Sequence, residues 1–259
     1  MNVSAVAVVV PAHNEAERVV ACIRSIGSAA DQVAPLPVHT VLVADDCTDA
    51  TAALAAREGA HVLAIARRNV GAARAAGVLR ALSLLGPSEP DIWLAMTDAD
   101  STVPAHWLTR QTAWARRGHD LVLGTIRLAP PAPTSSGRAR ERHDAAYFRT
   151  RPTTPGGPPW QHPHIHGANM GFSATAYRRV GGFAPLTTSE DRDLVDRLSA
   201  AGHRIARSDD HPVRSADRLR GRAPGGLADL LASLRLSGQP PEVATAAMAG
   251  PRSTTAPEP

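Results

Sequence analysis

The chain has 259 residues, 43% of them hydrophobic, which is enough to bury a sizeable core in one large domain or two smaller ones. All 28 basic residues are arginine, and the absence of lysine excludes chemistry that requires a lysine amine, such as a Schiff base or a P-loop. The formal net charge of +4 is mildly basic without a basic and aromatic module, which favours an anionic ligand over nucleic acid.

The cysteines and the N-terminus indicate the compartment. Cys22 and Cys47 show neither metal spacing nor a disulfide framework, which is typical of a reduced, cytoplasmic protein. The N-terminal apolar run lacks a basic segment and is too short for a signal peptide. No stretch approaches the roughly 20 apolar residues that span a bilayer, so we expect a soluble protein without a transmembrane segment.

The first part of the chain alternates between short apolar runs and longer amphipathic or alanine-rich runs. These predict strands at 3–10 (ended by Pro11), 39–45, 60–66 and 92–97, and helices at 15–29, 49–58 and 69–86. Strands and helices that alternate at this rhythm indicate βαβ units. The predicted class is therefore α/β, with a single, mostly parallel, doubly wound sheet and helices on both faces.

The pattern weakens after residue 125. Residues 129–160 are rich in proline, glycine, serine and arginine and predict a long mobile loop, with one helix around 138–149. Beyond it we expect order at 167–183, a helix at 190–201, a short strand at 203–208 and a last helix at 224–236. The polar composition from Ser237 onward predicts disorder.

The fourth predicted strand ends abruptly on two carboxylates, Asp98 and Asp100. Carboxylates this close disfavour ionisation unless a cation neutralises them, and oxygen ligands at an open strand end suit Mg²⁺ or Mn²⁺. Such an ion can bridge a protein carboxylate to a diphosphate. The alternative is that the aspartates only cap the next helix.

Six motifs in order give the chain a resemblance to the family 2 glycosyltransferases, which have the GT-A (nucleotide-diphospho-sugar transferase) fold. The motifs are "VVVPAHNEAERVVACIRSI", "VLVADDCTDATAALA", "RRNVGAARAAGV", "WLAMTDADSTVPAHWL", "GANMGFSATAYRRVGGF" and "SEDRDLVDRL", and together they cover roughly residues 4–210. A dinucleotide-binding Rossmann domain would instead need G-x-G-x-x-G after the first strand, where this chain has "PAHNEA". The resemblance implies one domain at 1–236, made of a nucleotide-binding half (1–126) and an acceptor half (127–236) that carries the loop at 129–160, followed by a disordered tail at 237–259.

The resemblance also implies a metal-dependent glycosyltransferase that moves one sugar from a UDP-, GDP- or dTDP-sugar to an unidentified acceptor. The residues at its nucleotide-binding positions are Pro11, Ala12, Glu15, Asp45, Asn69, Gly71 and Arg74. Of these, Asp45 would bind the base, Gly71 would let the backbone approach the nucleotide, and Arg74 would add a fixed positive charge. A capping role for Asp45 and a solvated helix face for Arg74 are the alternatives.

The implied metal site begins at the D-x-D element. Asp98 would bind the donor and the metal, and Asp100 would be the direct ligand of Mn²⁺ or Mg²⁺. Further along, "HPVR" resembles an H-x-x-R element, in which His211 would complete the metal site and Arg214 would meet the diphosphate. This element keeps a retaining enzyme that acts on a small acceptor as an alternative.

The acceptor side is implied by two later motifs. The first, Gly167, Ala168 and Asn169, would border the donor sugar and the acceptor. The second is the pair Glu190 and Asp191 at a helix start, where Asp191 would take the proton of the acceptor hydroxyl and Glu190 would act structurally. A single displacement of this kind inverts the anomeric centre. The plainer alternative for both acids is that they complement the helix dipole.

The role of three histidines stays open, and two other functions of the chain are alternatives. The alternating histidines His162, His164 and His166 indicate either loop residues near a phosphate or sugar, or a zinc site. A nucleotidyltransferase would need a glycine-rich first loop and a lysine, which are absent. A non-catalytic nucleotide-sugar-binding protein is the alternative of another class. The chain also lacks the Q-x-x-R-W motif of membrane-embedded, processive members.

Overall fold

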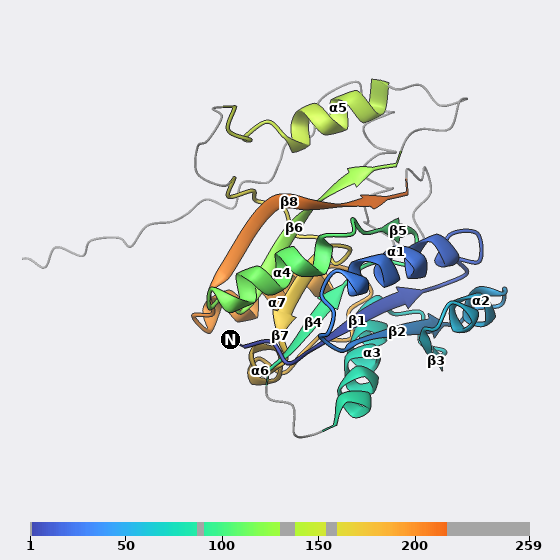
Figure 1. The fold of residues 1–259 in the computed structure, drawn as a ribbon. Coiled ribbons are helices and arrows are strands. Elements are labelled where there is room, and N and C mark those ends of the chain that lie inside the picture. Colours follow the sequence, from blue (N-terminus) through green and yellow to red (C-terminus); the bar gives the residue numbers. More distant parts are fainter. Residues whose placement is uncertain (1, 87–90, 130–137, 154–159, 217–259) are drawn as a thin grey trace, which may run out of the picture.

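The computed structural model describes residues 2–86, 91–129, 138–153 and 160–216. Within them the chain forms one eight-stranded sheet in the order β3-β2-β1-β4-β7-β6-β8-β5, with helices on both faces (Figure 1). The helix predicted at 224–236 and the tail predicted at 237–259 lie outside the described residues. None of the described helices is both long enough and apolar enough to cross a membrane.

The N-terminal half is the regular part of the sheet. Its elements are β1 (Ala5–Ala12), α1 (Val19–Asp31), β2 (Val38–Asp45), α2 (Thr51–Arg57), β3 (His61–Ile65), α3 (Val70–Leu85) and β4 (Ile92–Met96). All four strands run parallel, as the sequence predicts. The prediction that β1 ends before Pro11 is wrong, because β1 continues through it to Ala12. Pairing with β4 stops at Val9, so the missing N–H of Pro11 falls where β1 has lost one neighbour.

The C-terminal half is mixed. Its elements are β5 (Ser101–Thr102), α4 (Trp107–Arg116), β6 (Leu121–Leu128), α5 (Arg138–Tyr147), β7 (Met170–Ser173), α6 (Ala174–Arg179), α7 (Glu190–Ala200) and β8 (Ile205–Ser215). β7 runs antiparallel to both β4 and β6, whereas β8 runs parallel to β6 and antiparallel to β5. The strand predicted at 203–208 is too short, because β8 passes a bulge and resumes pairing at Val213.

Two apolar layers hold the sheet between the helices. One face packs against α1, α2 and α4, and the other against α3, α6 and α7 (Figure 1). Consecutive residues of β1 serve opposite layers, with Val8 in the first and Val9 in the second. A Cβ at Gly77 of α3 would lie 2.4 Å from Val9 Cγ1, so the glycine permits close helix-on-sheet packing.

A third, smaller core lies under α5, inside the segment predicted as a mobile loop. It consists of Ile126, Tyr147, Trp160 and Ala168, with Phe148 packed against it. Tyr147 Oη accepts a hydrogen bond from Ile126 N (3.1 Å), which ties the end of α5 to β6. The predicted helix at 138–149 is therefore present, and its C-terminal end is anchored to the sheet. Residues 130–137 and 154–159 of the predicted loop lie outside the described residues.

Candidate active site

The polar segments that follow β1, β2 and β3 meet at one edge of the sheet, because parallel strands end on the same side. The backbone there is unusual. Asn14 (φ 54°), Asp46 (φ 54°) and Arg68 (φ 47°) adopt left-handed conformations, and so does Ser189 (φ 60°) just before α7. Such conformations are costly for non-glycine residues and concentrate at functional sites.

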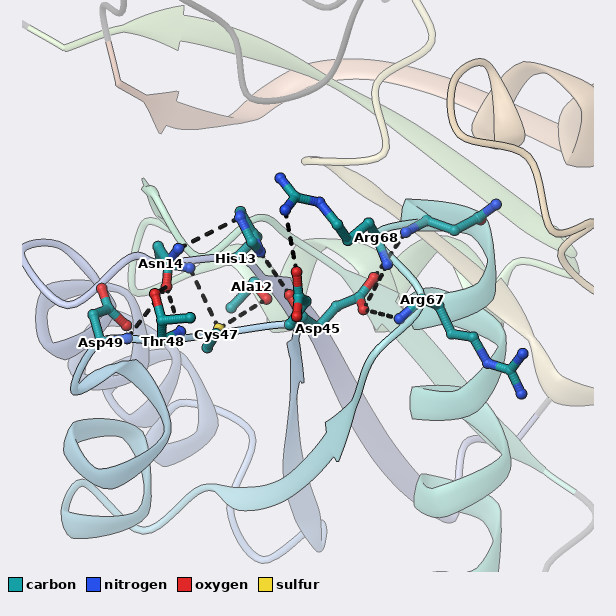
Figure 2. A network of polar contacts seen from close by, with 11 residues as sticks. Ala12, His13, Asn14, Asp45, Cys47, Thr48, Asp49, Arg67 and Arg68 are labelled. Carbon is teal, nitrogen blue, oxygen red and sulfur yellow. Dashed lines mark hydrogen bonds and ion pairs between the residues drawn. The ribbon is translucent and has the colours of Figure 1, made fainter.

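The Asp45 carboxylate at the end of β2 organises the loop that follows β3 (Figure 2). Its Oδ1 accepts hydrogen bonds from the backbone N–H of Arg67 (2.7 Å) and Arg68 (2.9 Å), and its Oδ2 accepts one from Asn69 N (2.8 Å). Asp45 is buried, so these donors replace the water that it loses. Asp45 therefore fixes the loop between β3 and α3, and does not cap α2. Base binding by Asp45 stays a prediction.

The loop after β1 is tied to the loop after β2 in the same view (Figure 2). Asn14 Oδ1 accepts hydrogen bonds from Thr48 N (2.8 Å) and Asp49 N (3.3 Å), and His13 Nδ1 donates to the Asp45 carbonyl (2.7 Å). Glu15, which is buried, donates its backbone N–H to Thr51 Oγ1 (2.7 Å). The predicted nucleoside-lining residues Pro11, Ala12 and Glu15 thus lie at this junction of two loops.

Asn69 and Gly71 contact the segment 184–186. Asn69 caps α3 by accepting from Ala72 N (2.9 Å), and its Nδ2 donates to the Pro185 carbonyl (2.8 Å). A Cβ at Gly71 would lie 2.2 Å from the Ala184 carbonyl oxygen. The backbone that approaches Gly71 closely is the segment 184–186, which docks on the start of α3. A close approach of the nucleotide to Gly71 stays a prediction.

Arg74 lies at the centre of the site, and the alternative of a solvated helix face is wrong. Its side chain is only 3% exposed. Nη2 donates to Asp98 Oδ1 (2.7 Å), Nε to Glu190 Oε1 (3.0 Å), and Nη1 to the Gly167 carbonyl (3.1 Å). One guanidinium thus joins the end of β4, the start of α7 and the segment before β7. A Cβ at Gly167 would lie 2.4 Å from Arg74 Nη2, so this arrangement requires glycine.

More carboxylates than cations surround the Arg74 guanidinium. Burial alone lowers the pKa of Arg74, but the nearby carboxylates, first Asp98 and then Glu190, outweigh it and raise the pKa above its ordinary value. Burial also raises the pKa of Glu190, against the opposing effect of Arg74. Because Asp191 is a third carboxylate beside this single cation, the group favours a further cation.

Asp191 and Asn169, two predicted site residues, lie in different environments. Asp191 is half-buried, and its Oδ2 accepts from Gly167 N (2.7 Å). Asn169 is fully buried, its Nδ2 donates to the carbonyls of Thr125 (2.8 Å) and His211 (3.0 Å), and its Oδ1 accepts from Trp107 Nε1 (2.9 Å). With both amide hydrogens and its oxygen engaged, Asn169 braces β6 and β8. Its place beside the donor sugar and the acceptor stays a prediction. The neighbouring Ala168 is buried in the core under α5.

The predicted metal ligands come from two elements that are paired in the sheet. Thr102, which follows the D-x-D element, pairs with Arg214 in β8, the last residue of the H-x-x-R element. His211 is fully buried, its Nδ1 lies 2.6 Å from Asp210 Oδ1, and its Nε2 has no hydrogen-bond partner in the described part of the chain. The described residues contain no group of three or more histidine, cysteine or acidic side chains that could hold a metal.

The donor set nevertheless fits a hard divalent cation bound largely by a ligand. Mg²⁺ at nucleotide sites commonly takes only one or two carboxylates, with phosphate and water oxygens completing its coordination. Asp98 and Asp100 would supply those carboxylates, and Nε2 of His211, which has no hydrogen-bond partner among the described residues, is a further candidate ligand. Asp98, however, also shares its Oδ1 with Arg74.

His162, His164 and His166 form a stacked column against α5. Ring centroids are 5.8 Å apart for His162 and His164, and 6.0 Å apart for His164 and His166. Tyr147 stacks on His164 at 3.7 Å, and its Oη lies 3.0 Å from His166 Nε2. The rings point the same way, as their alternation predicts, but nothing in the described chain gathers them as a zinc site.

A separate hollow of about 630 Å³ opens beside α3. It is lined mainly by apolar side chains and contains none of the carboxylates described above. Its lining is Ile65, Arg67, Asn69, Ala72, Ala75, Ala76, Leu79, Phe183 and Pro185. Asp45 adjoins this hollow, because it accepts hydrogen bonds from Arg67 and Asn69 of the lining. The carboxylates of Asp98, Asp100 and Asp191, in contrast, do not line it.

Sequence comparison matches the chain to a family model and to curated relatives. A family model described as "Glycosyl transferase family 2" matches residues 7–181. An uncharacterised glycosyltransferase of Mycobacterium tuberculosis is 35% identical over 123 residues, which is 48% of this chain and 49% of the relative. The match thus spans about half the length of the curated relatives.

Solved structures give three informative neighbours. Mannosyltransferase PcManGT from Pyrobaculum calidifontis, in complex with GDP-Man and Mn²⁺, has a TM-score of 0.60 at 20% identity over 90% of this chain and 70% of that chain. S. aureus TarS 1-349, in complex with UDP, has a TM-score of 0.60 at 14% identity, over 83% of this chain and 61% of that chain. Glucosyl-3-phosphoglycerate synthase from Mycobacterium tuberculosis, in complex with Mn²⁺, UDP and phosphoglyceric acid, has a TM-score of 0.54 at 21% identity, over 90% of this chain and 75% of that chain. At these identities the likeness confirms the predicted GT-A fold.

Proposed function

The chain belongs to glycosyl transferase family 2, and from this premise we propose that it transfers one sugar from a nucleotide-diphosphate sugar to an acceptor hydroxyl. UDP, GDP and dTDP are the candidate nucleotides. The acceptor oxygen forms a bond to the anomeric carbon as the bond from that carbon to the diphosphate breaks. The nucleoside diphosphate leaves with the bonding electron pair, and a single displacement of this kind inverts the anomeric centre.

The observation that carries the proposal is the Arg74 cluster. Arg74 connects Asp98, at the strand end expected to meet the donor diphosphate, with Glu190, which precedes the proposed base. The same guanidinium holds the Gly167 carbonyl, while the Gly167 N–H binds Asp191. Donor and acceptor residues are thereby held in fixed relation, which is the main requirement for a displacement between two bound substrates.

In this proposal Asp191 is the general base and Glu190 is a positioning residue. Asp191 is half-buried, and both of its oxygens accept hydrogen bonds from backbone N–H groups, Oδ2 from that of Gly167 (2.7 Å) and Oδ1 from that of Arg192 (2.7 Å). The carboxylate is therefore held in place while it keeps access to solvent. It would accept the proton of the acceptor hydroxyl during attack. Glu190 is buried and bonded to Arg74, which suits support of the site better than proton transfer to a substrate.

The metal in this proposal is Mn²⁺ or Mg²⁺. Asp100 and Asp98 would hold it, with His211 as a further ligand, and its chemistry would be to neutralise charge on the departing diphosphate. The carboxylate excess around Arg74 supports a cation here. PcManGT and glucosyl-3-phosphoglycerate synthase, which share the fold, are complexes with Mn²⁺.

The first experiment screens UDP-, GDP- and dTDP-sugars against the full chain with and without Mn²⁺. Thermal shift reports binding, and release of free sugar reports slow transfer to water. We expect one nucleotide class to raise the melting temperature and to be hydrolysed. A non-catalytic nucleotide-sugar-binding protein would show the shift without hydrolysis, and absence of any shift would contradict the proposal.

The metal assignment has its own test. In Asp100→Asn the Mn²⁺-dependent part of the nucleotide-induced thermal shift should disappear, because one of the proposed metal-binding carboxylates is lost. Asp31→Asn, at an exposed position at the end of α1, is the matched control and should keep the whole shift. If Asp100→Asn also keeps it, Asp100 is not a metal ligand.

A further inference from the structure

Two arginines lie side by side where β6 and β8 pair. Arg127 of β6 and Arg214 of β8 are partners in the parallel register, and Arg214 is in turn opposite Thr102 of β5. Paired residues on neighbouring strands project from the same face of a sheet. Both arginines are exposed, whereas Ile126 and Val213, the preceding pair, are buried, which confirms that the arginines share the outer face.

Neither arginine has an ion-pair partner among residues 2–86, 91–129, 138–153 and 160–216. Two acids of β8 are engaged elsewhere, since Asp209 pairs with Arg151 (2.6 Å) and Asp210 with His211 (2.6 Å). The Arg127 guanidinium instead lies over the Phe148 ring, 4.6 Å from its centroid. The aromatic ring restrains the position of this charge without neutralising it.

Like charges directly opposite one another on adjacent strands are unfavourable for the free protein. The arrangement becomes favourable when an anion lies between them, because each guanidinium presents a planar fork of N–H donors that matches a phosphoryl or carboxylate group. We propose that Arg127 and Arg214 form a binding site for a phosphoryl group, with Arg127 as a contributor that the family motifs do not mark.

The source of the phosphoryl group rests on the proposed function, although the existence of the site does not. Thr102 lies two residues beyond Asp100, so the pair borders the region assigned to the donor diphosphate. Phe148, on the other side, follows the C-terminal end of α5 in the acceptor half. The bound group is therefore either the donor diphosphate or a phosphate carried by the acceptor.

The experiment measures binding by calorimetry to the full chain at low salt, with three anions (pyrophosphate, inorganic phosphate and UDP) and the uncharged nucleoside uridine as probes. The variants are Arg127→Gln and Arg127→Lys, and Arg179→Gln on the exposed side of α6 is the control with the same change of charge. We expect pyrophosphate affinity to fall about tenfold or more in Arg127→Gln, with partial rescue in Arg127→Lys, and to stay unchanged in the control. The melting temperature of ligand-free Arg127→Gln should stay close to wild type, because the relieved repulsion and the lost contact with Phe148 oppose one another.

Two arms distinguish the sources. If Arg127→Gln weakens UDP but not uridine, the site holds the donor diphosphate. If UDP is unaffected but inorganic phosphate no longer binds the UDP-saturated protein, the site holds an acceptor phosphate. Unchanged affinity for all three anions overturns the inference. Phosphate binding without any nucleotide-sugar turnover would retain the site while contradicting the proposed function.

Discussion

At the ends of β2 and β3 the Asp45 carboxylate is held by three backbone N–H groups, whereas between the two halves of the chain the carboxylates of Asp98 and Glu190 are held by one buried guanidinium. The backbone donors are neutral and belong to a single loop. The guanidinium is charged, and its partners come from segments far apart in the sequence. The first arrangement shapes a loop, and the second couples two halves of a site through one side chain.

The difference has an energetic consequence. Losing one of three backbone donors leaves Asp45 partly satisfied, because each hydrogen bond is made independently. Losing the Arg74 side chain removes every contact that it makes and leaves the buried Glu190 without its cation. Breaking a buried ion pair from one side is typically far more costly than the net contribution of the intact pair. The Arg74 cluster is therefore the more vulnerable of the two arrangements.

The largest expected effect is that of Arg74→Met. It should lower the free energy of unfolding by about 3 kcal/mol or more, because the desolvated carboxylate of Glu190 loses its partner. Urea denaturation measures the change. The double variant Arg74→Met, Glu190→Leu should recover part of the loss, since no charge is then left buried. A loss of about 2 kcal/mol or less, the value expected for Asp45→Asn, would show that the cluster is no more vulnerable than the Asp45 loop.

Asp191→Asn separates chemistry from structure within the cluster. It keeps the shape and an oxygen for the Gly167 N–H but removes the basicity, so transfer or slow hydrolysis should fall by about 10²–10⁴-fold while donor affinity persists. Glu190→Gln is the matched control and should act mainly through stability. An inactive Glu190→Gln beside a normal Asp191→Asn would exchange their roles. If both remain active, no base acts here and the retaining alternative gains support.

Asp45→Asn should lower the free energy of unfolding by less than Arg74→Met does. One side-chain oxygen remains as an acceptor, but the other is replaced by an NH₂ group, which is a donor and faces a backbone N–H donor. We therefore expect a loss of about 2 kcal/mol in the free energy of unfolding. Donor binding should weaken as the β3–α3 loop loosens. Thermal denaturation with and without nucleotide measures both effects. Asp46→Asn, whose side chain is partly exposed and pairs only with Arg68 among the contacts described, is the control and should be near wild type.

The smallest expected effect is on the pH dependence of the free energy of unfolding. It tests whether the acceptor half loses stability in acid more readily than the nucleotide-binding half. Burial lowers the pKa of His162 to about 4, and the hydrogen bond to the Leu123 carbonyl only partly opposes this. Between an unfolded value of about 6.5 and the folded value, the unfolded chain binds a proton that the folded chain does not. Stability should therefore fall as pH drops from about 6.5 to 4, by about 1–2 kcal/mol from this residue.

His162→Gln should flatten that slope, and His61→Gln, at an exposed position on β3, should not. Urea denaturation at a series of pH values measures the slope. If wild type and His162→Gln show the same slope of unfolding free energy against pH, a group other than His162 causes the loss of stability in acid.

Much of the N-terminal half could be predicted because its information is local. Unbroken apolar runs such as that of β1 indicate strands buried on both faces, and their alternation with helical runs predicts a parallel sheet. The order of motifs identified the family, and the segments that contain Arg74, Asp98 and Asp191 do meet in the fold. The sequence pattern failed at β6, because its run "LVLGTIRL" carries a glycine, a threonine and an arginine, although all of its residues except Arg127 are buried in the structure.

The sequence by itself determined which segments are strands and helices in the first half, and which residue types lie at the strand ends. Only the tertiary structure decided what those residues contact. Gly71 faces the segment 184–186, Asn169 braces two strands, and Arg127 stands beside Arg214. The physical reason is that periodicity reports the burial of a side chain within one segment, whereas a contact between distant segments depends on how the sheet brings them together.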